Sequence, residues 1–414
     1  MADLMPTRRR LLLAAATGGL GFAAWSCSGW AGDSDTPWMH MALTQDPATG
    51  QWIRRFSGRA APVDALPDPV TGALIRVREF FPNQHDPFPI NDRLMLGEGG
   101  YMLRTLDRAR MGMAPGRDHQ SWSMNMIPFG VMLDGSFLDP SGPWFDGGPA
   151  SPHNPFDRAC TGWEYEVMHP VVSRLVGVPS AIAGHVQPSG LFHYHGYPRL
   201  LIANLRMLAT SRGGATAPLL VGYSADGFPI VDHLVASRGD GRQEFCFSGY
   251  VLRSGQRVVL SRTNPALVPN GPFDGLFVQD YVFDPERKRR EIEARLDRGE
   301  SYHGLTRRAL DEGRAAYVLL DPHNGAHLAD VEGYAQKVFA YVLTPDWPMV
   351  PRIFAFEPDD SFKNVIPLDP PSRRAGAAGP ASAQPRMGPG RRALYTACSD
   401  EMKSIRQWFD RPIY

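Results

Sequence analysis

Three histidines lie close together in one short segment, GHVQPSGLFHYHGYP, and their spacing suits metal binding. They are His185, His193 and His195. The aromatic residues around His193 are typical of a β-strand, in which side chains alternate between faces, so His193 and His195 project from the same face. Their Cα atoms are then about 6.6 Å apart, which allows both imidazoles to reach one ion. Pro188 and Gly190 allow a turn that returns His185 towards that ion.

A His-x-His pair with a third histidine matches a three-ligand metal site that keeps an open coordination position. Imidazole suits several divalent metal ions, so zinc, copper and iron all remain candidates. Alternatively, His193 and His195 are buried structural side chains that hydrogen-bond to carbonyl groups. A cupin-type site is not supported, because Arg199 and Leu200 stand where such a site needs a glutamate.

A carboxylate candidate follows in the segment LLVGYSADGFPI, where a predicted buried strand runs into an Asp-Gly turn. Asp226 could serve there as a fourth ligand, as a general base, or as the acceptor that orients a ligand histidine. Alternatively, Asp226 only closes the turn. His323, at the end of another predicted strand, is a second candidate base.

The elements that position these side chains are predicted to be mainly short strands, since 42 glycines and 38 prolines favour turns over long helices. Asp134-Gly135 predicts a hairpin between two strands. Leucines at helical spacing predict a helix over residues 199–211. No internal repeat of 20–50 residues is visible.

The highly charged segment 284–314 predicts a helical insertion between two strands. Asp284 is a candidate N-cap and Gly299 a candidate stop for its first helix. A second short helix is expected to end near Glu312. We therefore predict a mainly β, sandwich-like antiparallel domain with a few helices and this insertion.

Composition divides the chain into four parts. Residues 1–31 are predicted to be an export signal and residues 38–367 a β-rich domain. Residues 368–392 are rich in proline, glycine and alanine, which predicts a disordered linker. Residues 393–414 are predicted to form an amphipathic C-terminal helix.

The N-terminal segment has the features of an export signal. Arg8 and Arg9 precede an uncharged run of 14 residues, shorter than the ~20 that a transmembrane helix needs. The paired arginines resemble a twin-arginine signal. We therefore expect a periplasmic or secreted protein with no membrane span in its mature form. Cleavage after Ala31 is one alternative, and a lipid anchor at Cys27 is the other.

The charge balance and the remaining cysteines limit the other possibilities. The chain has 43 basic and 43 acidic residues, which argues against a nucleic-acid partner. Three cysteines lie beyond the signal, at Cys160, Cys246 and Cys398, so they cannot all pair within the chain. Cys160–Cys246 is a candidate disulfide in an oxidising compartment. Since none lies in a CxxC pair, they do not predict a thiolate zinc site.

Five segments in this order resemble the YHYH family, a group of exported proteins named for a Tyr-His-Tyr-His motif. The most specific matches are HVQPSGLFHYHGYP at 185–198 and LVGYSADGFPI at 220–230. Weaker matches are IPFGVMLDGSFLDP at 127–140, LDPHNG at 320–325 and YVLTPDWPMVPR at 341–352. The resemblance implies an exported domain in which the three histidines fall inside the family's motif, and it assigns no reaction.

The chain departs from the family pattern at several positions. Phe192 replaces the first tyrosine of the motif. Pro322 and His323 replace an acid and a cysteine of the family, so a disulfide implied there is lost. The second histidine motif of some members has no counterpart around Tyr341, and the insertion at 285–314 is atypical.

We therefore expect an exported protein that binds one divalent metal ion through His185, His193 and His195, with Asp226 as a fourth or outer ligand. One alternative is a mononuclear metalloenzyme, whose ion lowers the pKa of bound water so that the water can attack a substrate. The other is a non-catalytic cell-envelope binding domain with histidines in its core. The sequence specifies neither a substrate nor an oligomeric state.

Overall fold

The chain divides into two units, Met1–Ala31 and Gly32–Tyr414, and every described residue belongs to the second. The computed structural model describes residues 39–62, 65–67, 74–76, 90, 93–116, 122–123, 127–142, 163–178, 182–187, 190–211, 218–236, 242–260, 269–363 and 365. The predicted signal, linker and C-terminal helix lie outside these residues, as do Cys27, Cys160 and Cys398. Cys246 is described and is buried. Since its candidate partner Cys160 is not described, the pairing of the two stays a prediction.

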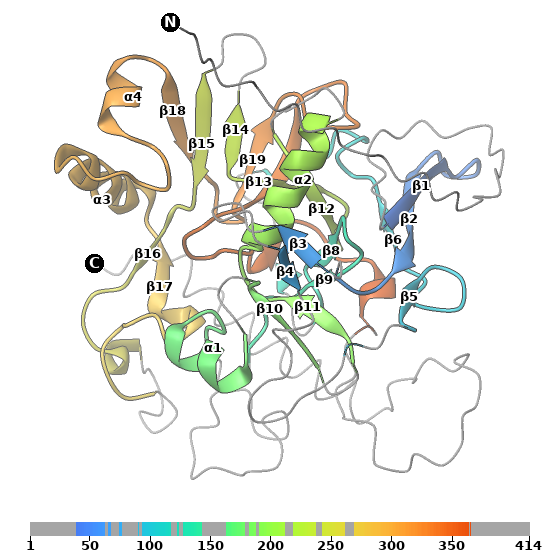
Figure 1. Ribbon diagram of the computed structural model, residues 1–414, viewed down its shortest axis with the longest axis horizontal. Coiled ribbons are helices and arrows are strands. Elements are labelled where there is room, and N and C mark those ends of the chain that lie inside the picture. Colours follow the sequence, from blue (N-terminus) through green and yellow to red (C-terminus); the bar gives the residue numbers. More distant parts are fainter. Residues whose placement is uncertain are drawn as a thin grey trace, which may run out of the picture. The chain divides into compact units, whose positions relative to one another are not determined.

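An eight-stranded sheet forms the centre of the fold (Figure 1). Its strands are β8 (Gly130–Met132), β9 (Phe137–Leu138), β10 (Gly184–Val186), β11 (Phe192–Tyr194), β12 (Leu220–Ser224), β13 (Pro229–Asp232), β19 (Gly325–Leu328) and β20 (Val338–Leu343). They lie in the order β10-β11-β9-β8-β12-β13-β20-β19. β9 pairs with β11 and β13 with β20 in parallel, whereas the other neighbours are antiparallel.

Smaller sheets surround this one. One contains β1 (Met39–Gln45), β2 (Trp52–Arg59), β5 (Met95–Leu96) and β6 (Arg104–Leu106), and another contains β14 (Leu234–Ala236), β15 (Gln243–Phe247) and β18 (Ala315–Leu319). The two-stranded pairs are β3 (Ala65–Pro67) with β4 (Leu74–Arg76), β7 (Trp122–Ser123) with β21 (Ile353–Phe354), and β16 (Tyr250–Leu252) with β17 (Tyr281–Phe283). The helices are α1 (Pro170–Val176), α2 (Arg199–Ser211), α3 (Pro285–Asp297) and α4 (Arg307–Asp311).

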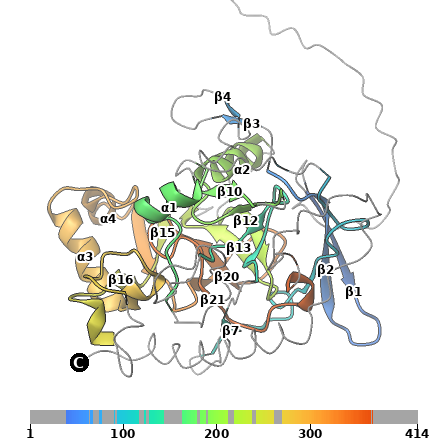
Figure 2. The same ribbon diagram turned by 90° about the horizontal axis from the view of Figure 1, so that it is seen from below.

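One main hydrophobic core joins the β1/β2 sheet, α2 and the eight-stranded sheet. Phe56 of β2 packs against Tyr223 of β12, with ring centroids 6.2 Å apart, and the Arg54 guanidinium lies over the same tyrosine ring. The apolar face of α2 adds Leu201 and Leu205 to this core. Figure 2 shows α2 along the large sheet near β12 and β13. Burial of these apolar side chains is the main force that holds the layers together.

Three of the described helices, α2, α3 and α4, lie within one residue of where the sequence predicts them, whereas α1 was not predicted. α2 spans the predicted residues 199–211. The Asp284 carboxylate accepts a hydrogen bond from the backbone N–H of Arg287, which caps α3, and Thr306 caps α4 in the same way. α3 and α4 lie between β17 and β18, so the predicted helical insertion is confirmed. Ile292 and Leu296 of α3 pack into a second core with residues of β15.

The predicted mainly β, sandwich-like class is also confirmed, with a large sheet that is mixed rather than uniformly antiparallel. The parallel pairs follow from long crossover connections. The chain runs from β9 through α1 and β10 before β11 pairs with β9. Among the helices of the described ranges, none is both long and apolar enough to cross a membrane.

Two Asp-Gly turns reverse the chain within the large sheet, at Gly135 between β8 and β9 and at Gly227 between β12 and β13. Both glycines have left-handed backbone angles, with φ of +85° and +91°. A Cβ at Gly135 would lie 1.9 Å from the Arg59 carbonyl oxygen, and one at Gly227 would lie 1.8 Å from that of Leu106. Both turns therefore require glycine for two reasons, the backbone angle and the close approach of β2 and β6.

Replacing either turn glycine by alanine is expected to destabilise the fold strongly. Gly227→Ala should lower the free energy of unfolding by about 3 kcal/mol or more, because strain at positive φ adds to a backbone clash. Gly299→Ala is the matched control, since its φ is +76° but nothing lies within 4 Å of its Cβ position. It should cost about 1 kcal/mol. Equal losses in denaturant unfolding would contradict the close approach of Leu106.

Candidate metal centre

β10 and β11 bring the three histidines together. In this antiparallel hairpin His185 lies directly opposite His193, so their side chains share one face. His195 follows the last residue of β11, and its backbone N–H donates to the Ala183 carbonyl at 2.7 Å. Strand alternation then places its side chain on the face of His193. Figure 1 shows the hairpin beside α1, at the edge of the large sheet.

The Nε2 atoms of the three rings converge on one point. His193 Nε2 lies 2.8 Å from His195 Nε2, which lies 3.1 Å from His185 Nε2. The candidate ligand atoms of the three residues all lie within 4.8 Å of one another. His193 and His195 are buried, whereas His185 is partly exposed. The juxtaposition predicted from the sequence is therefore present.

A backbone carbonyl fixes the tautomer of His185. Its Nδ1 lies 2.8 Å from the carbonyl oxygen of Val176, in the last turn of α1. A carbonyl only accepts hydrogen bonds, so Nδ1 carries the hydrogen and Nε2 of the neutral ring presents its lone pair. The contact thus joins the histidine ring to the C-terminal end of α1. Metal-binding histidines commonly use their second nitrogen in this way.

The contacts between the rings suit a shared cation better than hydrogen bonds alone. A neutral imidazole has one N–H, so a hydrogen on His195 Nε2 would be divided between His185 and His193. A cation accepts all three lone pairs at once. The donor set thus fits a metal that prefers imidazole nitrogen.

The environment keeps the three rings neutral, which is the form that binds metals. Burial is the main cause that lowers the pKa of each ring. Neighbouring histidines lower the pKa of His193 and His195 further, and the Arg352 guanidinium adds to the effect at His195. Backbone carbonyl groups act in the opposite direction at each ring, but burial dominates.

Asp226 is not a member of this cluster. Its carboxylate accepts hydrogen bonds from the hydroxyls of Ser224 at 2.5 Å and Tyr341 at 2.6 Å, and from the backbone N–H of Phe356 at 3.0 Å. Asp226 thus closes the β12–β13 turn and ties it to β20. The cluster also omits His323, whose Nδ1 lies 3.6 Å from an Asp321 oxygen.

The structure adds a charged group that sequence reasoning missed. Arg352 forms an ion pair with Glu166 and donates a hydrogen bond to the Pro140 carbonyl at 2.6 Å. The indole N–H of Trp347 donates a hydrogen bond to the same Glu166 oxygen, Oε2, at 2.7 Å. The segment YVLTPDWPMVPR was the available signal, but only the folded chain shows that the field of its arginine reaches His195.

Buried acids surround this arginine. Burial raises the pKa of Glu164 to about 7 and that of Asp139 to about 6, although Arg352 lowers both. The Glu164 carboxylate also accepts a hydrogen bond from the backbone N–H of Gly142 at 2.7 Å. Both acids are therefore partly protonated near neutral pH.

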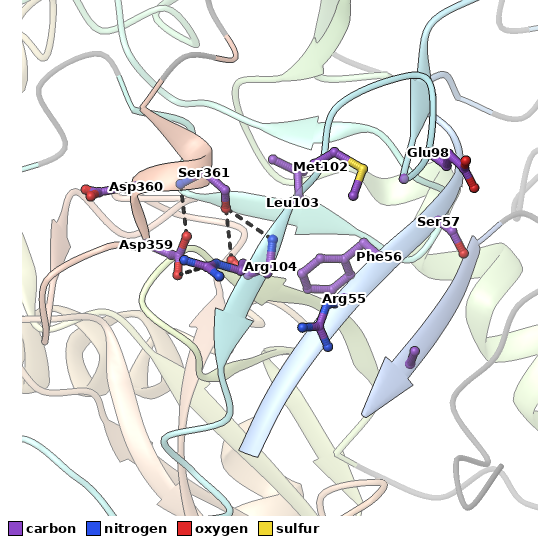
Figure 3. A pocket seen from close by; sticks show the side chains of 12 residues that line it. Arg55, Phe56, Ser57, Glu98, Met102, Leu103, Arg104, Asp359, Asp360 and Ser361 are labelled. Carbon is purple, nitrogen blue, oxygen red and sulfur yellow. Dashed lines mark hydrogen bonds and ion pairs between the residues drawn. The ribbon is translucent and has the colours of Figure 1, made fainter. Parts of the chain in front are cut away.

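A pocket of about 570 Å³ lies elsewhere, between the β1/β2 sheet and the turn that contains Ser361 (Figure 3). None of the three histidines lines it. Three of its polar residues pair with one another, because Arg104 forms an ion pair with Asp359 and exchanges backbone hydrogen bonds with the Ser361 hydroxyl. It lacks the convergent donors of the histidine cluster, which we therefore take as the candidate site.

Comparison with known proteins gives one match. A family model described as "YHYH protein" matches residues 108–355, more than half of the chain. The matched region contains all eight strands of the large sheet and the three histidines, whereas β1, β2, β5 and β6 precede it. No curated protein and no solved structure matches the chain.

The raised pKa of Glu164 predicts how stability depends on pH. The folded chain holds a proton that the unfolded chain releases, so this stabilisation is complete below pH 4.5 and is lost as the pH rises through about 7. Glu164→Gln should flatten this decline by on the order of 2 kcal/mol in denaturant unfolding between pH 4.5 and 8. The exposed Glu98→Gln is the control. Parallel stability curves for wild type and Glu164→Gln would contradict the assignment.

Proposed function

This chain belongs to the YHYH family, and we propose that it binds one transition-metal ion through the Nε2 atoms of His185, His193 and His195. The observation that carries the proposal is their convergence on one point. The Nδ1 contact of His185 supports it, because that contact turns the lone pair of the ring towards the other two histidines. Imidazole donors are compatible with zinc, copper or iron.

The same donor set gives a reason to test for catalysis. Three histidines leave one coordination position, and a divalent ion supplies Lewis-acid chemistry there when bound. His185 is the partly exposed ligand, so we propose that a fourth ligand enters from its side. Azide added to Co²⁺-loaded protein should change the visible spectrum if that position exchanges. An unchanged spectrum favours a closed, non-catalytic site.

We also propose that the chain is exported, to the periplasm or beyond the cell, as the N-terminal sequence predicts. Arg8 and Arg9 with the following apolar run support this proposal. Export of an already folded chain would let the histidine cluster form, and take its metal, before translocation.

Removal of two histidines tests the metal proposal. His193→Ala combined with His195→Ala should reduce bound metal from about one equivalent per chain to near zero, since one imidazole cannot hold the ion. Elemental analysis of the full-length protein, purified without chelator, measures this. His327→Ala is the control, because that histidine is exposed on β19 and lies outside the cluster. Full metal content in the double variant would refute the ligand assignment.

Conservative replacement of the paired arginines tests export. Arg8→Lys combined with Arg9→Lys should retain the protein in the cytoplasm, because the pair is recognised as a unit and not as charge alone. Cell fractionation with immunodetection measures the exported fraction, and Arg10→Lys is the matched control. Undiminished delivery of the double variant would exclude the twin-arginine route.

A further inference from the structure

The eight-stranded sheet consists of two halves with the same connectivity. From the centre outwards, the first half runs β8-β9-β11-β10 and the second runs β12-β13-β20-β19. Each half joins an inner hairpin to an outer hairpin through one parallel pair, β9 with β11 and β13 with β20. β8 and β12 are antiparallel at the centre, so an approximate twofold axis relates the halves.

The residue register at the centre obeys this symmetry. Val131 pairs with Tyr223 on the axis, and the two flanking pairs, Gly130 with Ser224 and Met132 with Gly222, exchange under the rotation. The two glycines are equivalent in packing as well. A Cβ at Gly130 would lie 2.3 Å from the Tyr223 carbonyl oxygen, and one at Gly222 would lie 2.6 Å from that of Val131.

The outer hairpins repeat the same details. Gly184 lies opposite Tyr194, as Gly325 lies opposite Tyr341. The residue before each glycine has a left-handed backbone, with φ of 58° in the first half and 57° in the second. The carbonyl of that residue accepts a backbone hydrogen bond from the residue after the tyrosine in both halves.

This correspondence aligns the metal-binding strand with β20. Phe192-His193-Tyr194-His195 matches Phe339-Ala340-Tyr341-Val342, and His185 matches Ala326. The second half thus keeps the aromatic residues but has alanine, alanine and valine at the three histidine positions. The described part of the chain therefore holds one histidine cluster on a scaffold with two equivalent places.

A tyrosine–aspartate hydrogen bond is present in both halves. The Tyr194 hydroxyl donates to Asp134 at 2.8 Å, and the Tyr341 hydroxyl donates to Asp226 at 2.6 Å. Each aspartate stands in the Asp-Gly turn of the inner hairpin of its half. Asp226, which the sequence suggested as a ligand, is therefore the counterpart of Asp134.

We propose that Tyr194 and Asp134 form a positioning pair, which aligns β11 so that His193 and His195 meet His185. This inference rests on the proposed metal binding. Tyr194 stands between the two ligands and projects to the opposite face of the strand, so it acts through the backbone and not on the ion. Asp134 is anchored in its turn, because its other oxygen accepts the Ser136 N–H at 2.9 Å.

The required precision makes this alignment important. Metal–nitrogen distances tolerate deviations of about 0.2 Å, so a small shift of β11 is enough to weaken binding. Loss of the Tyr194 hydroxyl leaves a buried Asp134 oxygen without this donor and allows that shift. The equivalent loss at Tyr341 affects a strand that carries no ligand.

The two halves supply a matched experiment within one chain. Tyr194→Phe and Tyr341→Phe are compared in the full-length protein with Zn²⁺ competition and with Co²⁺ absorption spectra. Both variants should lose thermal stability, and Tyr341→Phe should lose more, because the Tyr341 hydroxyl also accepts the Ala355 N–H at 2.6 Å. Only Tyr194→Phe should weaken Zn²⁺ binding, by roughly tenfold, and shift the Co²⁺ bands. Wild-type affinity and spectrum in Tyr194→Phe, or equal weakening in both variants, would overturn the positioning role.

A second pair covers the case in which a tyrosine variant fails to fold. Asp134→Asn and Asp226→Asn keep the side-chain size and alter the same hydrogen bond from its acceptor side. Weaker Zn²⁺ binding is expected only for Asp134→Asn, and equal binding in the two variants would overturn the inference. Failure of the proposed function is distinguishable, because wild-type protein would then bind neither Zn²⁺ nor Co²⁺.

Discussion

The fold depends on carboxyl groups that are buried in the two Asp-Gly turns of the large sheet. Burying a carboxyl group costs folding free energy unless hydrogen-bond donors surround it. Burial raises the pKa of Asp134 to about 6, although its hydrogen-bond donors lower that pKa. Tyr194 and Tyr341 supply one donor to each turn from a strand that is distant in sequence. Each hydrogen bond therefore links the turn of an inner hairpin to the next strand outwards in the sheet, which is β11 in the first half and β20 in the second. The histidine cluster lies on the strand that one of these bonds fixes.

Local signals were sufficient to predict much of the structure. The leucine spacing predicted α2, and Asp284 predicted the start of α3, because both depend on residues within one or two turns. The histidine cluster was predictable for the same reason. Strand alternation aligns His193 with His195, and a short reversal returns His185, so residues 185–195 alone predict that the three side chains share one face.

Long-range pairing accounts for what the sequence could not predict. The sequence offered Asp226 as a ligand, a base or a turn residue, and it could not show the partner Tyr341, which lies over a hundred residues away. The twofold relation between the halves was hidden because they share only a few residues, such as the equivalent Gly130 and Gly222. The connections within the halves also differ in length, since α3 and α4 are inserted only in the second. The correspondence is therefore visible in the strand topology and register, and in few of the side chains.

Electrostatics around the histidine cluster explains the role of the segment that ends at Arg352. A cation held by three neutral imidazoles keeps its full charge, and the arginine already imposes a positive field on His195. Glu166 pairs with that arginine and is itself held by Trp347, whose ring stacks on Tyr281 with centroids 4.0 Å apart. The Glu166 carboxylate therefore offsets the positive charge of Arg352 without being one of the grouped ligand residues. In the proposed metal site, the imidazoles would hold the ion, while the Glu166 carboxylate balances the charge of the neighbouring arginine.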